Sequence, residues 1–209
     1  MLKVLTAAQM REVDRLTTER YGIPSILLME NAAHAVARVI TEKLGGSVKG
    51  KRILILCGPG NNGGDGAALA RILWEQEADC FALLLGRVDA TRGDARVNFE
   101  IEILRRISDS SDANSVTTNC LYLNESDEEA SVIDELNSGR ATDCVVDALF
   151  GTGLTRPLAG NFLKAVEDLT FRHRHLKQML VVSVDLPSGM DADRNVLIGE
   201  AVCPDTTVT

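Results

Sequence analysis

Short apolar runs alternate with amphipathic stretches along most of the chain. The first run, Arg52 to Cys57, is continuous, as expected for a strand that is buried on both faces. Between the runs, apolar residues recur at helical spacing. This alternation predicts an α/β protein, a Rossmann-like three-layer αβα fold with a mostly parallel sheet, preceded by two N-terminal helices. Further strands are predicted at Cys80 to Leu85, Cys120 to Leu123, Cys144 to Leu149 and Met179 to Val184, and helices at Thr6 to Arg20, Ser25 to Leu44, Asp65 to Gln76, Asp94 to Ile107, Asp127 to Leu136 and Gly160 to Leu169.

The length of 209 residues predicts one domain rather than two. We expect residues 6–45 to form the N-terminal helices and residues 51–209 to form the Rossmann-like core. The polar stretch from Ser108 to Thr118 is predicted to be a surface loop. Asp205 to Thr209 has the pattern of a strand that has only begun, so we expect the core to be truncated at its last strand.

Composition and charge narrow the possible partners. Hydrophobic residues make up 45% of the chain, which allows a sizeable core, and only 4% of the residues are aromatic. Thirty acidic and twenty-two basic side chains give a net charge of −8, which repels nucleic acid and anionic membranes. An anionic small molecule remains a possible ligand, because backbone amides can supply local positive potential.

The cysteines and the N-terminal residues favour a cytoplasmic protein. Five cysteines are scattered without a CxxC pair, mostly within apolar runs, which predicts reduced and buried thiols. The stretch from Met1 to Arg20 is charged throughout and does not resemble a signal peptide. No apolar run reaches the roughly 20 residues that a membrane span needs.

A glycine-rich stretch follows the first predicted strand. Five glycines, two asparagines and an aspartate lie between Gly58 and Gly66, and Gly58, Gly60 and Gly63 satisfy GxGxxG. Glycines allow backbone amides to approach a phosphate, and the N-terminus of the following helix adds favourable potential. The alternative is a tight strand-to-helix turn capped by Asp65, but such a turn seldom needs five glycines.

An NAD(P)-dependent oxidoreductase is a weaker interpretation. Such a protein places an acidic residue at the end of its second strand, on the ribose hydroxyls. Here the second strand ends in Leu85-Gly86-Arg87, and Asp79 lies at its start.

Two further predicted strands end in aspartates. Asp147 leads into a Gly-rich loop, and Asp185 leads into Leu-Pro-Ser188-Gly. A carboxylate beside a buried strand is costly unless it is paired, hydrogen-bonded or bound to a cation, and the plain alternative is an Asx turn. Asn62, Asp147 and Ser188 together offer only oxygen ligands of the kind that suit a hard cation and not zinc.

Other polar residues carry weaker signals. His173 and His175 lie in a basic run that we expect to be a solvated face, and His34 is expected to be a packed helix residue. Glu30 and Asn31 interrupt an apolar helix, and are either exposed or line a site.

Four motifs together resemble the YjeF N-terminal domain family. They are Leu28 to Ala33, Gly58 to Gly66, Val146 to Gly153 and Val184 to Gly189, and the resemblance runs from about Thr6 to Val208. The resemblance implies a Rossmann-like domain with NAD(P)H-hydrate epimerase activity, a bound K⁺ and a homodimer. It also implies a partner activity, because a dehydratase domain follows in many bacterial members.

The resemblance assigns the residues of the site. Asn62, Asp147 and Ser188 would bind K⁺. The substrate would be hydrated NADH or NADPH (NAD(P)HX), whose pyrophosphate would rest on the glycine-rich stretch. The residues implied to contact it are Asn61, Asn62, Gly63, Gly64, Asp65, Gly151, Thr152, Gly153, Leu154, Thr155, Arg156, Pro157 and Asp185.

Epimerisation at C6 of the nicotinamide ring requires loss and return of water through an iminium-like species. A carboxylate can give a proton to the leaving hydroxyl and take one from the returning water, and we assign this role to Asp185. The competing hypothesis is a non-catalytic nucleotide-binding or protein-binding module of the same fold. The intact glycine stretch and both strand-end aspartates favour the enzyme.

Overall fold

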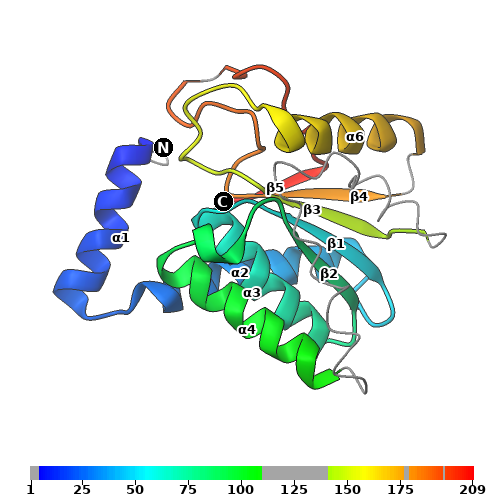
Figure 1. Ribbon diagram of the computed structural model, residues 1–209, viewed down its shortest axis with the longest axis horizontal. Helices are drawn as coiled ribbons and strands as arrows, with labels where there is room; N and C mark the ends of the chain where they lie inside the picture. The colour runs from blue at the N-terminus through cyan, green and yellow to red at the C-terminus, as the bar shows by residue number, and fades with distance from the viewer. Residues whose placement is uncertain (1–4, 110–140, 177–178, 195) are drawn as a thin grey trace.

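A parallel β-sheet forms the middle layer of the protein (Figure 1). The computed structural model describes residues 5–109, 141–176, 179–194 and 196–209. Within these residues the sheet has five strands in the order β2-β1-β3-β4-β5, and every pairing is parallel. The predicted α/β class is therefore confirmed. The strands are β1 (Arg52–Cys57), β2 (Asp79–Leu84), β3 (Cys144–Ala148), β4 (Leu180–Val184) and β5 (Thr206–Val208).

Helices cover both faces of the sheet and complete the three layers. Helices α2, α3 and α4 lie on one face and α6 lies on the other (Figure 1). The helices are α1 (Ala7–Tyr21), α2 (Ser25–Lys43), α3 (Asn61–Glu75), α4 (Gly93–Asp109) and α6 (Gly160–Leu176), with a short 3₁₀ helix η1 (Val88–Ala90) before α4.

The central strands are buried on both faces, as their apolar runs predict. Every residue of β1 is buried. Ile53 and Ile55 belong to the core beneath α2, α3 and α4, whereas Leu54 and Leu56 belong to the core beneath α6. The alternation follows from the two-residue period of a strand, and it leaves the strand ends as the place where polar groups meet.

Several element boundaries differ from those predicted. Helix α3 begins at Asn61 rather than at Asp65, so the second half of the glycine-rich stretch is helical. Helix α6 continues past Leu169 to Leu176. Helix α4 runs to Asp109 and so includes the first two residues of the predicted loop. The rest of that loop, the strand predicted at 120–123 and the helix predicted at 127–136 lie outside the described residues.

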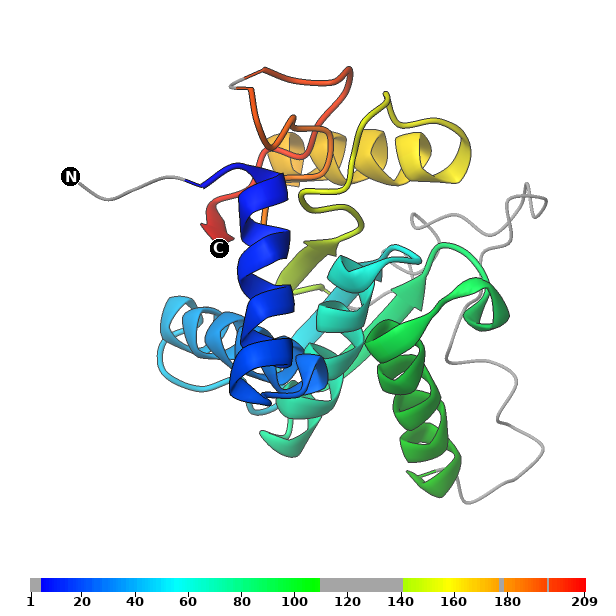
Figure 2. The same ribbon diagram turned by 90° about the vertical axis from the view of Figure 1, so that its left-hand side faces the viewer.

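Helix α1 stands in front of the carboxyl edge of the sheet (Figure 2). It begins with the predicted capping box between Thr6 and Gln9, and only Ala7 of its residues is buried. The Ala7 amide also donates to Asp193 Oδ1 at 2.7 Å, which ties the start of the helix to the loop after β4. Helix α1 is thus a peripheral element placed beside the strand ends.

Three of the cysteines are buried free thiols, namely Cys57, Cys80 and Cys144. Cys203 is exposed, which departs from the expectation of buried thiols, and Cys120 lies outside the described residues. Among the described helices, none combines the length and the apolar character needed to cross a membrane.

Candidate functional site

Three neighbouring strands end at one edge of the sheet, and the loops that follow them meet there. In the register of β1 and β3, Cys57 lies opposite Ala148, and in that of β3 and β4, Asp147 lies opposite Ser183. The first turn of α3, the loop after β3 and the loop after β4 therefore converge. In open parallel sheets, ligands bind at such an edge.

Glycine is required where β1 turns into α3. The Gly58 amide donates to Ala148 O at 3.0 Å, and a Cβ on Gly58 would lie 1.9 Å from Leu149 O. A Cβ on Gly63 would lie 1.8 Å from Gly58 O. These contacts press the first turn of α3 against the loop after β3, and no larger residue fits.

Met29 and Glu30 of α2 contact α3 at and near this turn. Met29 is buried, and a Cβ on Gly64 would lie 2.9 Å from its Cε. Glu30 forms an ion pair with Arg71 of α3 at 2.6 Å, and Asn31 is exposed. Met29 and Glu30 therefore fasten α2 to α3.

The first turn of α3 offers unpaired polar groups. No side chain caps the helix, so its first backbone amides, including those of Asn61 and Asn62, have no intrahelical acceptor. The side chain of Asn62 is almost fully buried, and its Nδ2 atom has no hydrogen-bond partner among the described residues. Asn61 is exposed. A buried amide without a partner is uncommon, and this one is available to a ligand.

Asp147 is fully buried at the end of β3 and is surrounded by neutral donors. Ser188 donates to it twice, from Oγ at 2.6 Å and from its backbone amide at 2.8 Å. Ser183 Oγ donates at 2.8 Å and the Leu149 amide at 3.3 Å. Burial raises the pKa of Asp147 although these four donors oppose the shift. Among the described residues, no ion pair neutralises its charge.

Asn62, Asp147 and Ser188 fit a hard cation by their chemistry. All three side chains are buried and carry oxygen, and Asp147 supplies a charge that a cation would offset. The unpartnered Nδ2 of Asn62 is compatible with this set, because a half-turn of the amide exchanges its nitrogen and oxygen.

Asp185 is held differently at the end of β4. Its backbone adopts the left-handed region with φ 64°, which is unusual for a residue with a side chain. Its Oδ2 accepts one hydrogen bond, from the Thr152 amide at 2.9 Å, and a Cβ on Gly151 would lie 2.1 Å from the same oxygen. Asp185 is partly buried, and this burial raises its pKa.

Asp65 lies one helical turn after Asn62, on the same side of α3. Burial, together with the negative charges of Asp185 and Asp14, raises the pKa of Asp65 to about 7. It is not the helix cap considered above, because α3 begins four residues earlier with Gly60 as its N-cap.

Asp14 of α1 is a site residue that the sequence did not indicate. Its charge raises the pKa of both Asp65 and Asp185. Asp14 occupies an exposed position of an ordinary amphipathic helix, so only the placement of α1 in front of the strand ends brings it to the site (Figure 2).

The loop after β3 supplies the remaining predicted residues. Gly151, Thr152 and Leu154 are partly buried. Gly153, Thr155, Arg156 and Pro157 are exposed, so Arg156 is accessible to a ligand at this edge.

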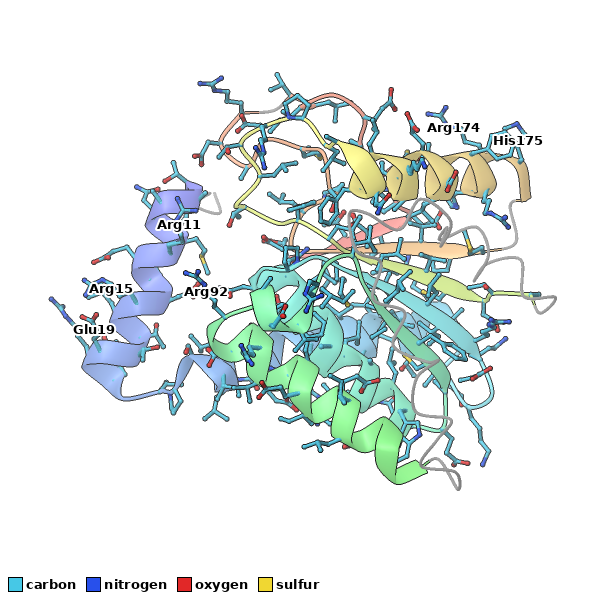
Figure 3. The ribbon with its side chains drawn as sticks, viewed as in Figure 1. Arg11, Arg15, Glu19, Arg92, Arg174 and His175 are labelled. Atoms are coloured by element: carbon cyan, nitrogen blue, oxygen red, sulfur yellow. The ribbon has the colours of Figure 1, made fainter. Side chains whose placement is uncertain are left out.

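The histidines lie away from these aspartates. Arg174 and His175 lie near the end of α6 farthest from the carboxyl edge (Figure 3). His173 is not the solvated residue expected from its basic surroundings, because it is partly buried and lies 3.4 Å from Asp205. His34 is exposed and lies 3.5 Å from Glu30 on its own helix, so it is not packed as expected.

The sequence profile described as "YjeF-related protein N-terminus" matches residues 25–209. A "Bifunctional NAD(P)H-hydrate repair enzyme Nnr" of Moorella thermoacetica is 39% identical over 99% of this chain and 35% of its own length. An "NAD(P)H-hydrate epimerase" of Limosilactobacillus fermentum is 32% identical over 99% of this chain and 85% of its own length. The chain thus spans about a third of the bifunctional relative and most of the epimerase.

A solved structure has the same fold. The crystal structure of the yeast protein ynu0 superposes with a TM-score of 0.76 at 27% sequence identity. The match covers 99% of this chain and 79% of the yeast chain.

Proposed function

The chain belongs to the family of YjeF-related proteins, and we propose that it is an NAD(P)H-hydrate epimerase. It interconverts the R and S forms of hydrated NADH or NADPH at C6 of the nicotinamide ring. The observation that carries the proposal is the meeting of two strand-end aspartates with an uncapped, glycine-lined helix start. Relatives named for this activity, one of them matched over 85% of its length, support it.

The substrate is a dinucleotide whose phosphates are negatively charged, while the chain itself carries a net charge of −8. Binding therefore needs local positive potential. The free amides at Asn61, Asn62 and Gly63 supply it for the pyrophosphate, because the helix dipole adds to their hydrogen bonds. The exposed guanidinium of Arg156, in the loop after β3, adds a positive charge at the same edge of the sheet.

Asp185 is the residue proposed to act on the C6 hydroxyl. Among the described residues, only the Thr152 amide donates to its carboxylate, so further oxygen lone pairs are available to the substrate. The raised pKa of Asp185 is closer to neutral pH than that of an ordinary carboxyl, which suits a group that gives and takes a proton. Its negative form would also stabilise the iminium-like species formed when water leaves.

Asn62, Asp147 and Ser188 would hold K⁺ at the same edge of the sheet. A bound K⁺ would supply positive charge close to the substrate phosphates. The protein residues in turn fix the loops: Ser188 Oγ accepts from the Phe150 amide at 2.9 Å while its own amide donates to Asp147. This joins the loops after β3 and β4, and so joins the residues on either side of the substrate.

The assembly and the setting follow as parts of the same proposal. Exposed apolar side chains on and near α1, including Met10, Val13 and Tyr21, offer a surface for a second copy in a homodimer. The cytoplasm, where thiols stay reduced, suits the free cysteines. The product is expected to pass to an NAD(P)HX dehydratase, either fused or separate.

The test uses a mixture of R and S hydrates of NADPH with an S-specific dehydratase and ATP in K⁺ buffer. The dehydratase alone consumes the S form and then waits for slow spontaneous epimerisation of the R form. The proposed epimerase makes this second phase fast. If the phase is unchanged while the folded chain binds the hydrate, a non-catalytic binding module replaces the proposal.

A further inference from the structure

Asp65 is a carboxyl group that the structure partly buries without a hydrogen-bond donor from any described residue. It lies in the first turn of α3, and no hydrogen bond from the described part of the chain reaches its side chain. Asp147, by contrast, receives four donors. A buried carboxylate with no donor is unfavourable, so the environment favours the protonated form of Asp65.

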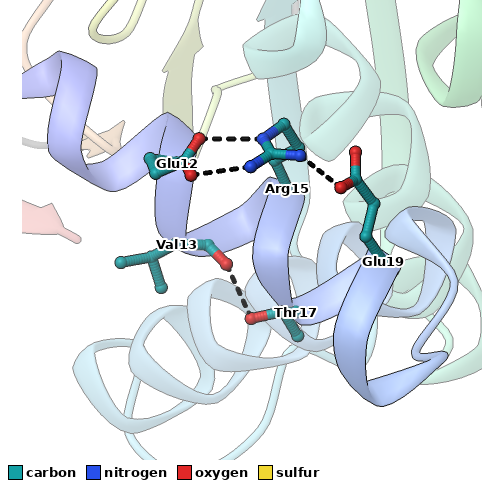
Figure 4. A network of polar contacts seen from close by, with 5 residues as sticks. All are labelled: Glu12, Val13, Arg15, Thr17 and Glu19. Carbon is teal, nitrogen blue, oxygen red and sulfur yellow. Dashed lines mark hydrogen bonds and ion pairs between the residues drawn. The ribbon is translucent and has the colours of Figure 1, made fainter.

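The charges that act on Asp65 come from two other elements, and both are negative. They are Asp185 after β4 and Asp14 on α1. Arg15, which follows Asp14 on α1, is bound to Glu12 and Glu19 on the helix surface (Figure 4). On the neighbouring helix α2, Glu30 is already paired with Arg71.

Two further cations flank this region. Arg11 lies on α1 and Arg92 lies at the turn before α4, where Asp94 follows (Figure 3). Neither arginine pairs with an acid elsewhere in the described part of the chain, and neither contributes to the pKa shift of Asp65. Asp65, Asp185 and Asp14 thus act on one another from three elements, and no ion pair among the described residues neutralises any of them.

Asn62 shows that this face of α3 is arranged for a ligand. Its Nδ2 atom is buried and unpartnered within the described residues, and it lies on the same side of the helix as Asp65. A polar ligand would meet both side chains, and then Asp185 across the strand ends.

We propose that Asp65 is a second proton-transfer residue of the epimerisation and acts as a pair with Asp185. The inference rests on the proposed function. Asp65 gives its proton to the C6 hydroxyl, the C6–O bond breaks with its electron pair leaving on water, and the ring nitrogen forms a double bond to C6 with its lone pair. Water then adds to the opposite face of C6, the double-bond electrons return to nitrogen, and Asp185 takes the proton that the water loses. The other epimer uses the same steps in reverse.

The experiment measures kcat and KM for the R hydrate of NADPH across about pH 5–9 in the coupled assay. For conversion of the R form to the S form, the wild-type kcat is expected to fall above about pH 7, because Asp65 must be protonated. Asp65→Asn is expected to lower kcat by about 100-fold or more, with little change in KM, and to remove that fall. Asp14→Asn is expected to shift the fall to lower pH, because a negative charge that raises the pKa of Asp65 is removed.

A matched control is Asp168→Asn on α6, a partly buried aspartate whose pKa burial also raises. This change should leave kcat and its pH profile unaltered. The inference is overturned if the wild type is active while Asp65→Asn keeps kcat within about threefold and the same profile.

An activity-independent measurement keeps the two proposals separable. Infrared difference spectra of the unliganded wild type and Asp65→Asn, or of wild type and Asp65→Glu if the first variant does not fold, follow the carboxyl of residue 65 with pH. Titration near neutrality supports the inference. Titration near pH 4 overturns it whether or not the chain is an epimerase. If the wild type is inactive although residue 65 titrates near neutrality, the proposed function is rejected, and the role of Asp65 in epimerisation falls with it.

Discussion

The ends of β3 and β4 each carry an aspartate, and the protein treats the two in opposite ways. Asp147 is fully buried and receives four hydrogen bonds from two serines and a backbone amide of the next loop. Asp185 is partly buried, sits in the left-handed region and receives one hydrogen bond. Burial raises the pKa of both carboxyls.

A shifted pKa alone therefore does not identify the reacting group. The oxygens of Asp147 are occupied by donors that hold two loops together, so its first task is structural. Asp185 keeps lone pairs free, and its backbone strain is a cost that a purely structural residue would not need. Available hydrogen-bonding capacity separates a supporting carboxylate from a reacting one.

Asp185→Asn tests directly whether Asp185 is the reacting carboxylate. The amide keeps the size of the side chain but cannot exchange a proton, so kcat is expected to fall by about 10²–10⁴-fold. The fall is measured in the coupled hydrate assay, and binding of the hydrate is measured by calorimetry. Full activity with unchanged binding would remove Asp185 from the mechanism.

Asp147→Asn should act on stability instead. The amide replaces one acceptor oxygen with a donor, so at least one buried donor from Ser183 or Ser188 loses its partner. We expect a loss of about 2–4 kcal/mol in the free energy of unfolding, measured by urea denaturation. K⁺ should stabilise the wild type more than the variant, and equal stabilisation would argue against a cation at Asp147.

Asp65→Asn is expected to stabilise the protein above neutral pH. The folded pKa of about 7 exceeds the unfolded value of 3.8, so the folded state holds a proton that the unfolded state has lost. The stability of the wild type therefore declines as pH rises from about 4 to about 7. At pH 8 the variant should be more stable by about 1–3 kcal/mol, and at pH 4 the difference should vanish. Melting curves at both pH values measure it.

Gly151→Ala should give the smallest change in stability. Its Cβ would meet Oδ2 of Asp185, the end of a side chain that can turn away, so a loss below about 1 kcal/mol is expected. This rotation of the Asp185 side chain misplaces its carboxylate, and we expect kcat to fall by about 10-fold. The matched variant Gly58→Ala meets the backbone oxygen of Leu149 and should destabilise the protein far more. Similar melting temperatures for the two variants would contradict this distinction.

The sequence predicted the layers of the fold because doubly buried strands such as β1 leave a continuous apolar run. It also predicted that Asp147 and Asp185 lie at the carboxyl ends of strands, which meet at one edge of a parallel sheet. It misplaced the start of α3, because Gly63 and Gly64 disfavour a helix locally. The two glycines are needed only because Gly63 packs against Gly58 and Gly64 packs against Met29, and these contacts exist only in the folded protein.

The roles within the site were harder to predict. Nothing in the sequence distinguishes Asp147 with four donors from Asp65 with none among the described residues, because three of the four donors belong to Ser183 and Ser188, 36 and 41 residues away. Asp14 was missed for a similar reason. Its helix is amphipathic and ordinary, and its relation to the site exists only in three dimensions.

The peripheral position of α1 has a thermodynamic consequence. Only Ala7 of this helix is buried, so detaching α1 from the body costs far less free energy than unfolding the sheet. When it is attached, Asp14 raises the proton affinity of Asp65 and Asp185. Linkage makes the effect reciprocal: protonation of those carboxyls favours the docked helix, and their ionisation favours its release. The protection factors of the α1 amides, which are relative to the intrinsic exchange rate at each pH, should therefore fall as the pH rises through 7, so that the protonation state of the site governs how firmly α1 is held.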